Sequence, residues 1–208
     1  MCAKIIFHPW VGENYGCDSS VLKKRTLILG GSHYLEGLNS DEDLGDFTNE
    51  VVNLYFDRNC KGKWKKTFST FINSIFGRST NEDERRVFFE SVVFYNYLQE
   101  VAGDNPGAAG NYDYGAIQHF EAFKLVLDEY KPEVVISWGD KVWEGLPNDW
   151  GFGGNVRGEG VIIDGTVFVK YFDYPYQNRV ISLVGVGHPS IGYSRDFHHQ
   201  IFKALNVV

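Results

Sequence analysis

Short apolar runs alternate with longer amphipathic segments along this chain, and that alternation is typical of an α/β protein. Four runs are continuous enough to be buried strands: Thr26–Leu29, Ser91–Leu98, Val134–Trp138 and Val180–Val186. Apolar residues recur at helical spacing between and after these runs, in residues 41–76, 81–89, 117–130, 139–143 and 196–205. Because strands joined through helices form parallel sheets, the pattern predicts a parallel sheet with helices on both faces.

Glycine, proline and polar residues mark the expected ends of these elements. Gly77 is expected to end one helix, and Asn81 is expected to cap the next. Residues 1–25 are interrupted by glycine and proline, so they are expected to form an N-terminal arm or loop. Residues 161–163 and 167–169 flank Asp164-Gly165 and predict a hairpin. We expect residues 1–208 to form a single domain without internal repeats.

Composition allows a large core but gives no support for nucleic-acid binding. The 208 residues are 43% hydrophobic and 16% aromatic, and the formal net charge is -7. Basic residues nevertheless gather around Trp64, where Lys63 and Lys65 are candidates for contact with a phosphate backbone. A solvated helix face explains the same cluster equally well.

The sequence predicts a reduced, cytoplasmic protein. Nothing approaches the roughly 18 consecutive apolar residues of a membrane span, and the apolar stretch at the N-terminus is too short for a signal peptide. Cys2, Cys17 and Cys60 are odd in number and widely spaced, which fits free thiols. They lack the spacing of an iron–sulfur or zinc site, so we expect no metal and no cofactor.

Polar residues follow each of the four predicted strands. The carboxyl ends of parallel strands meet at one edge of a sheet, which is where open α/β folds place chemistry. A glycine pair after the first strand allows the backbone to approach a ligand closely, although the Gly-Lys-Ser/Thr ending of a P-loop is missing. The four segments at the strand ends are Gly30–Tyr34, Asn96, Ser137–Gly139 and Gly187–Ser190.

In this order the four segments resemble motifs of the uracil-DNA glycosylase superfamily. The family motifs are Gly-Gln-Asp-Pro-Tyr-His, Leu-Leu-Leu-Asn, Leu-Trp-Gly and His-Pro-Ser-Pro-Leu-Ser, and the last is the most specific. The matched order spans roughly residues 26–205. The resemblance implies a three-layer α/β/α sandwich with a central four-stranded parallel sheet. It also implies a monomeric, monofunctional DNA glycosylase that hydrolyses the N-glycosidic bond of a flipped-out pyrimidine.

The resemblance assigns roles to individual residues. His188 would donate a hydrogen bond to the departing base, and the Asn96 amide would read the edge of a pyrimidine. Tyr34 matches the residue beside carbon 5 of the base. Ser190 would hold a phosphate, and either Ile191 or Tyr193 would enter the gap left by the flipped nucleotide. Structural alternatives exist for three of these residues: His188 as an ordinary loop residue, Asn96 as a strand-end amide that ties down a loop, and Tyr34 as a core or rim aromatic.

The family aspartate that positions water and stabilises the cationic sugar is replaced by Ser32. Glu36, His33 or a loop acid such as Asp113 is a candidate replacement. Alternatively, the phosphates of the substrate stabilise the cation while Ser32 or His33 orients water, or the protein binds without cleaving. Gly31 and Ser32 are also smaller than the family residues, which favours a larger, modified base of the kind that bacterial defence glycosylases remove from phage DNA. Tyr34 opposes such a base if the bulk is on carbon 5.

Two other classes of function remain open. One is a catalytically silent module that binds nucleic acid or a nucleotide, which the lost aspartate and the acidic composition favour. The other is a serine hydrolase with Ser32 as nucleophile and His188 as base. The Gly-x-Ser-x-Gly elbow is incomplete for that activity, because Tyr34 stands at the last glycine.

Overall fold

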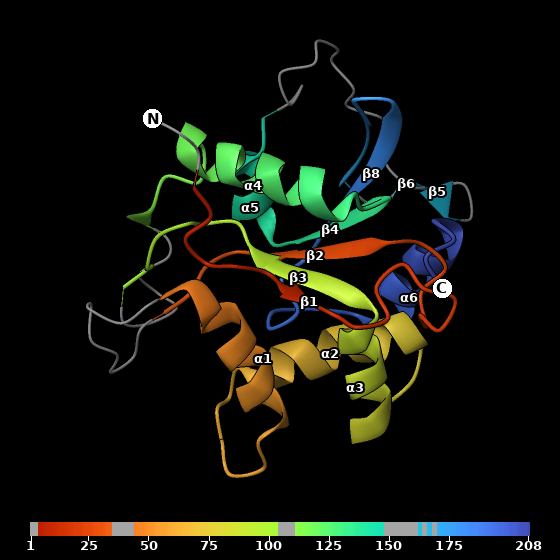
Figure 1. Cartoon of the computed structure of the whole chain (residues 1–208). Helices are drawn as coiled ribbons and strands as arrows, with labels where there is room; N and C mark the ends of the chain where they lie inside the picture. Colours follow the sequence, from red (N-terminus) through yellow and green to blue (C-terminus); the bar gives the residue numbers. More distant parts are fainter. Residues whose placement is uncertain (1–3, 35–43, 104–110, 148–161, 164–165, 168–169) are drawn as a thin grey trace.

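The computed structural model describes residues 4–34, 44–103, 111–147, 162–163, 166–167 and 170–208. Their centre is a six-stranded sheet in the order β1-β3-β2-β4-β8-β7 (Figure 1). A separate two-stranded sheet pairs β5 with β6. The strands are β1 Trp10–Val11, β2 Thr26–Gly30, β3 Val92–Asn96, β4 Val134–Trp138, β5 Ile162–Ile163, β6 Thr166–Val167, β7 Lys170–Tyr176 and β8 Arg179–Val186.

The four inner strands of the main sheet, β3, β2, β4 and β8, run parallel to one another. They are the four strands that the apolar runs predict, and every residue of β2, β3 and β4 is buried. The outer strands β1 and β7 pair antiparallel with β3 and β8. The predicted α/β class is confirmed, while the sheet is larger than expected and mixed in direction.

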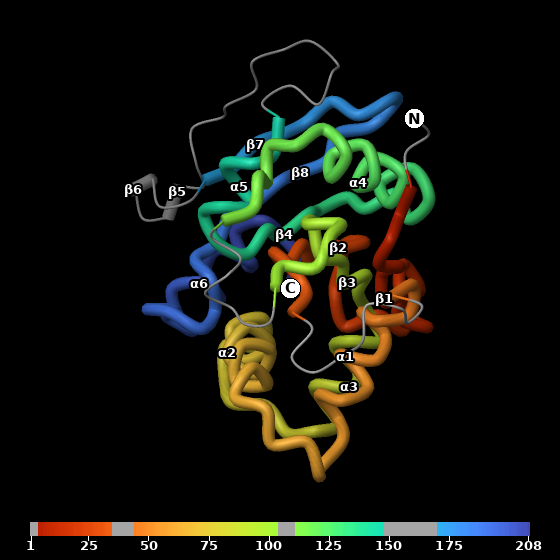
Figure 2. The backbone as a smooth tube through the Cα atoms, turned by 90° about the vertical axis from the view of Figure 1, so that its left-hand side faces the viewer, coloured from red at the N-terminus to blue at the C-terminus, as the bar shows by residue number. Residues whose placement is uncertain are grey.

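Helices cover both faces of the sheet and make three layers (Figure 1). Helices α4 (Ile117–Tyr130) and α5 (Asp140–Gly145) pack on one face. Figure 2 shows the same division after a 90° turn, with α1, α2 and α3 on the opposite side of the strands from α4. Elements on that second face are η1 Leu44–Asp46, α1 Phe47–Phe56, α2 Lys65–Phe76, α3 Glu82–Glu90 and α6 Arg195–Ala204.

The two outer strands lie where the apolar pattern gave no strand. Strand β1 belongs to the expected N-terminal arm, and its two residues are too few to show a periodicity. The chain before it is anchored as well, because the Gln99 side chain accepts hydrogen bonds from the Ile6 and Phe7 amides at 2.8 and 3.1 Å. In β7 the buried side chains alternate with more exposed ones, a period-2 signal that was present in the sequence.

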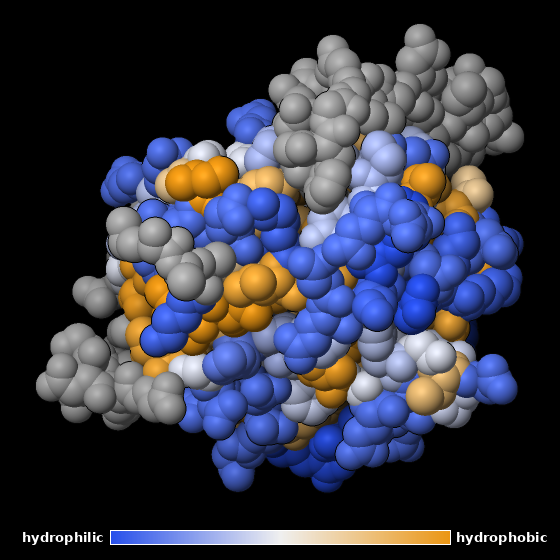
Figure 3. Space-filling view, turned by 45° about the horizontal axis from the view of Figure 1, so that its top comes forward, coloured by the Kyte–Doolittle hydropathy of each residue, from blue (hydrophilic) through white to orange (hydrophobic). Residues whose placement is uncertain are grey.

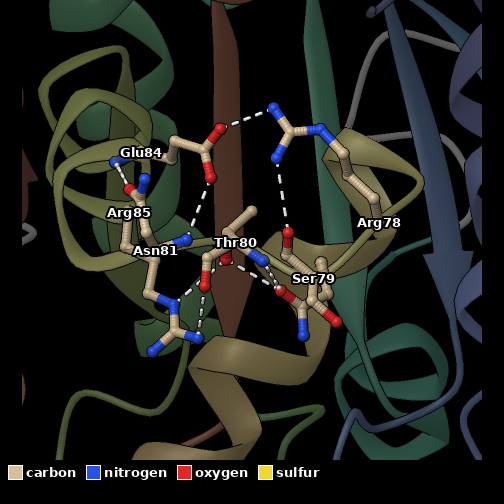
Figure 4. A network of polar contacts seen from close by, with 7 residues as sticks. Arg78, Ser79, Thr80, Asn81, Glu84 and Arg85 are labelled. Carbon is tan, nitrogen blue, oxygen red and sulfur yellow. Dashed lines mark hydrogen bonds and ion pairs between the residues drawn. The ribbon is translucent and has the colours of Figure 1, made fainter.

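Helix ends follow the local signals closely. Gly77 ends α2 with φ at 68°, the left-handed conformation that glycine adopts without steric cost. Asn81 caps α3 through a capping box, in which its side chain accepts from the Glu84 amide while Glu84 accepts from the Asn81 amide (Figure 4). Arg78 and Arg85 tie the same turn together through Glu84 and Thr80. Both predicted helix boundaries are confirmed.

Several other expectations concern segments that are partly described. The predicted hairpin is present as the antiparallel pair β5–β6, whereas positions 161, 164–165 and 168–169 lie outside the described residues. Of the cysteines, Cys17 and Cys60 are free thiols and Cys2 lies outside the described residues. In the part of the chain that the structure describes, no helix is long and apolar enough to cross a membrane.

Candidate functional site

The four polar segments converge at the carboxyl edge of the inner strands. Asn96 ends β3, the Gly31–Tyr34 loop follows β2, Gly139 follows β4, and His188 lies two residues after β8. Neighbouring strands are ~4.8 Å apart, so the ends of β3 and β8 are separated by ~14 Å.

His188 is held by the turn that contains it. Its Nδ1 accepts a hydrogen bond from the Ser190 amide at 3.3 Å and lies 2.6 Å from the Ser190 hydroxyl. A backbone amide can only donate, so Nδ1 is an acceptor and the proton of the neutral ring is on Nε2. No described residue hydrogen-bonds Nε2. The Nε2–H group is therefore a hydrogen-bond donor without a partner among the described residues.

The support beneath His188 comes from the end of β4. Gly139 has φ at 85°, and a Cβ atom at this position would lie 3.5 Å from the His188 Cβ. The Trp138 ring lies edge-on to the imidazole, with 6.4 Å between ring centroids, and it packs on Phe71 at 4.9 Å. His188 as a residue is exposed, and partial desolvation of its ring lowers the pKa of the imidazole. The ring is thus neutral in neutral solution.

Asn96 is buried and holds the loop after β2. Its Nδ2 donates to the Ser32 carbonyl at 3.3 Å and lies 3.1 Å from the His33 ring nitrogen Nε2. Asn96 Oδ1 lies directly over Gly30, because a Cβ at Gly30 would come within 2.1 Å of it. The amide nitrogen therefore holds the loop after β2 in place, while no described residue donates a hydrogen bond to Oδ1.

His33 lies on the inner side of the same loop. Only 3% of the residue is exposed, its ring packs between Phe7 and Phe47 at 4.7 and 4.8 Å, and its Nε2 lies 3.0 Å from the Thr48 hydroxyl. Burial lowers the pKa of His33 to about 3. This placement gives His33 a structural role in the loop, and it is neutral at every physiological pH.

Ser32 is hydrogen-bonded to a tyrosine of its own loop. Its Oγ donates to Tyr34 Oη at 2.9 Å. Tyr114 fills part of the space that the small Gly31 was expected to leave, since its Oη is 3.4 Å from where a Gly31 Cβ would be. Burial raises the pKa of Tyr114. The sequence interpretation missed Tyr114, although its position at the end of a long glycine-rich loop was a usable signal.

The turn after His188 separates the two candidate wedge residues. Ile191 is 76% exposed, the highest value among the large apolar side chains of the described residues. Tyr193 is held in place, because its ring stacks on His198 at 3.7 Å and its hydroxyl lies 3.0 Å from that of Ser74. Burial raises the pKa of Tyr193. Of the two, Ile191 is the side chain that projects into solvent.

The remaining candidates are not brought to the strand ends. Lys63 precedes α2 and Lys65 begins it, and the Lys65 ammonium donates to the Asp57 carbonyl. Asp113 accepts from the Gly115 amide at 2.9 Å and so shapes the turn before α4. Glu36 lies outside the described residues. No described carboxylate therefore contacts Ser32 or His188.

The molecular surface and the cavities of the described residues do not define the strand-end site further. Seen obliquely from the α4 side, the molecule carries a band of apolar atoms bordered by polar side chains (Figure 3). A cavity of about 440 Å³ lies beside β1, and another of about 240 Å³ lies between the ends of α2 and α6. Neither is lined by a residue of the strand-end site. Among the described residues, no group of three or more potential ligands is arranged to hold a metal ion.

The fold and the site define an α/β protein with a cluster of neutral hydrogen-bonding groups at the carboxyl ends of its parallel strands. No model of a known protein family matches the chain, and no curated protein matches it either. The function is therefore inferred from the geometry of the strand-end residues.

Proposed function

We propose that the protein is a DNA glycosylase that hydrolyses the N-glycosidic bond of a flipped-out pyrimidine or modified pyrimidine and leaves an abasic site. The observation that carries this proposal is the orientation of His188. The Ser190 amide fixes Nδ1 as an acceptor, so a neutral imidazole presents Nε2–H at the end of the fourth parallel strand. The three-layer arrangement and the order of the strand-end segments add support, because both agree with the glycosylase resemblance.

Cleavage of an N-glycosidic bond requires a hydrogen-bond donor such as the Nε2–H group of His188. When the glycosidic bond breaks, the bonding electrons leave with the base, and negative charge develops on the carbonyl oxygen beside the departing nitrogen. A neutral N–H donor in a fixed position stabilises that charge without first releasing a proton. The Trp138 ring and the turn between His188 and Ser190 limit movement of the imidazole, so the donor needs little reorganisation during the reaction.

Asn96 supplies the proposed base-reading group through its oxygen alone. Because Nδ2 is already bonded to the Ser32 carbonyl, Oδ1 is the atom left for the base. An acceptor at this point pairs with the N3–H of a uracil-type base and meets the unprotonated N3 of cytosine unfavourably. The proposal therefore favours bases of the uracil type, including modified ones.

The cationic sugar is the second requirement. Ser32 is neutral, and its hydroxyl donates to Tyr34, so it carries no charge to oppose the cation. In this proposal the phosphates flanking the flipped nucleotide provide that charge, which makes DNA a better substrate than a free nucleoside. Ile191 would fill the gap in the duplex, in keeping with its exposure.

The test uses duplexes that each carry one uracil or one modified pyrimidine, incubated with the purified chain and then treated with alkali. Strand cleavage reports an abasic product. His188→Ala should lower the excision rate by about 100- to 1,000-fold, because it removes one oxyanion donor. His8→Gln changes an exposed histidine and is the matched control. Full excision by His188→Ala, or no excision of any base by the natural chain, would contradict the proposal.

A catalytically silent DNA-binding module is the second candidate. The neutral Ser32 favours it, because this residue brings no charge to oppose a cationic sugar. The same duplexes distinguish the two, because a silent module would retain them without producing alkali-labile sites. The geometry gives less support to a serine hydrolase, because Ser32 donates to Tyr34 and the Nδ1 atom of His188 is bonded to Ser190.

A further inference from the structure

Gln99 is a buried amide whose orientation is fixed by its partners. Its Oε1 accepts hydrogen bonds from the backbone amides of Ile6 and Phe7 at 2.8 and 3.1 Å. Its Nε2 donates to the Asn96 carbonyl at 2.8 Å, and its backbone amide donates to His119 Nδ1 at 3.1 Å. Backbone amides only donate and backbone carbonyls only accept, so the reverse orientation of the side chain would lose three bonds. Gln99 therefore joins the segment before β1 to the residue that ends β3.

A second connection joins the same two segments through the Asn96 side chain. The Phe7 ring packs against the His33 ring with 4.7 Å between centroids. The Asn96 Nδ2 in turn lies 3.1 Å from the His33 Nε2. Phe7, His33, Asn96 and Gln99 are all buried. Asn96 is thus held at its backbone carbonyl by Gln99 and at its side-chain amide by His33, and both holders are tied to Phe7.

The strand pairing alone does not hold the Asn96 side chain. Strand β1 pairs with Val93 and Phe94 of β3, so this antiparallel ladder ends before Asn96. On the other side Asn96 is paired with Gly30, which has no side chain to limit rotation of the Asn96 amide. The contacts that Gln99 organises supply the restraint that the ladder lacks at this position.

We propose that Gln99 is a positioning residue that fixes the Asn96 amide and thereby sets the preference of the site for bases with an N3–H group over bases with an unprotonated N3. The inference rests on the proposed glycosylase function and deepens it. Gln99 does not touch the base and acts only through Asn96. A rotated Asn96 amide would present Nδ2 in place of Oδ1, and Nδ2 would donate to the unprotonated N3 of cytosine. Selectivity therefore requires that the amide be held in one orientation.

The test compares duplexes that carry one uracil or one cytosine opposite an abasic-site analogue, so that neither base is paired. Excision is measured as alkali-labile cleavage at that position. Binding is measured by fluorescence anisotropy with the 2′-fluorinated nucleotides, because the fluorine disfavours the cationic sugar and slows cleavage. The natural chain should prefer uracil by about tenfold or more, and Gln99→Met should lower this preference by about five- to tenfold.

Two further variants separate positioning from stability. Gln99→Glu keeps the bonds from the two backbone amides, which favour an ionised carboxylate, and loses only the donor to the Asn96 carbonyl. It should therefore lose as much of the preference as Gln99→Met and less of the urea midpoint. Asn73→Ala removes two hydrogen bonds to Thr80 on α2 and is the matched control. It should lower the urea midpoint and retain the preference, whereas a merely structural Gln99 would lose the preference in proportion to stability.

The orientation of Asn96 has a spectroscopic signature that does not depend on activity. Its Nδ2 signals in the ¹⁵N-labelled protein are assigned by their loss in Asn96→Asp. Because Nδ2 donates to the Ser32 carbonyl, its protons should exchange slowly with water in the natural chain. Both Gln99 variants should accelerate this exchange by about tenfold, and Asn73→Ala should leave it unchanged.

The outcomes distinguish this inference from the glycosylase proposal. Excision with an unchanged uracil preference in both Gln99 variants overturns the role of Gln99 and leaves the glycosylase standing, whether or not the Asn96 exchange changes. A binding preference that falls in both variants together with faster exchange, but without excision of any base, supports Gln99 and overturns the glycosylase. Neither excision nor a binding preference in the natural chain overturns both.

Discussion

Replacement of His33 by glutamine should remove a large part of the acid sensitivity of the fold. His33 is 3% exposed, and burial lowers its pKa from 6.5 to about 3. The folded state therefore keeps His33 neutral, whereas the unfolded chain protonates it below its ordinary pKa. Stability is at its full value above about pH 6.5, falls as the pH decreases through the acid range, and reaches its lower limit near the folded pKa.

The magnitude follows from the two pKa values. Each pKa unit corresponds to about 1.4 kcal/mol, so the full difference between them is worth roughly 5 kcal/mol of unfolding free energy. At about pH 5 the unfolding free energy is lower by ~2 kcal/mol, because this pH lies ~1.5 units below the pKa of histidine in the unfolded chain. A loss of this size is a substantial fraction of the ~5–15 kcal/mol that stabilises a typical domain.

The assay is urea unfolding of the natural chain and of His33→Gln between about pH 5 and pH 7. Glutamine does not titrate, and its amide is expected to replace the hydrogen bonds to Asn96 and Thr48. Burial also lowers the pKa of His119, His188 and His198, so both proteins should lose some stability in acid. The difference in slope isolates His33. Equal slopes for the two proteins would refute the reasoning.

Three further predictions concern the helix cap, the sheet edge and the exposed turn. Asn81→Ala breaks the capping box of α3 and should lower the unfolding free energy by about 1 kcal/mol in urea titrations; an unchanged midpoint would contradict the importance of the cap. Gly30→Ala places a Cβ within 2.1 Å of Asn96 Oδ1 and should cost about 1–3 kcal/mol, whereas Gly187→Ala, with open space around it, should change stability by less than about 0.5 kcal/mol. Equal losses for the two alanines would show that the close approach at Gly30 is unimportant. Ile191→Ala should leave the thermal midpoint unchanged and lower duplex binding by about tenfold, because its side chain is 76% exposed; binding equal to that of the natural chain would remove Ile191 from the interface.

The inner sheet and two of the helix boundaries could be predicted from the sequence, whereas the break between α1 and α2, inside the expected helical stretch 41–76, could not. The apolar runs that become β2, β3 and β4 are fully buried. Strands buried on both faces are continuously apolar, so each run could be identified as a strand from its own residues. Gly77 and Asn81 act within one turn of their own helices, and such local chemistry is readable residue by residue. His188 was identifiable for a related reason, since a turn after a parallel strand lies at a predictable edge.

Only the folded chain shows which polar groups are hydrogen-bonded to one another among the described residues and which are not. Asn96 donates its amide nitrogen to a loop 64 positions away, and the Tyr114 hydroxyl lies beside Gly31 at the end of the sheet. The choice of Ile191 over Tyr193 depends on Ser74 and His198, which fix the tyrosine from two helices. Periodicity reports only which face of an element is apolar, whereas these hydrogen bonds join residues that become neighbours only when the chain folds.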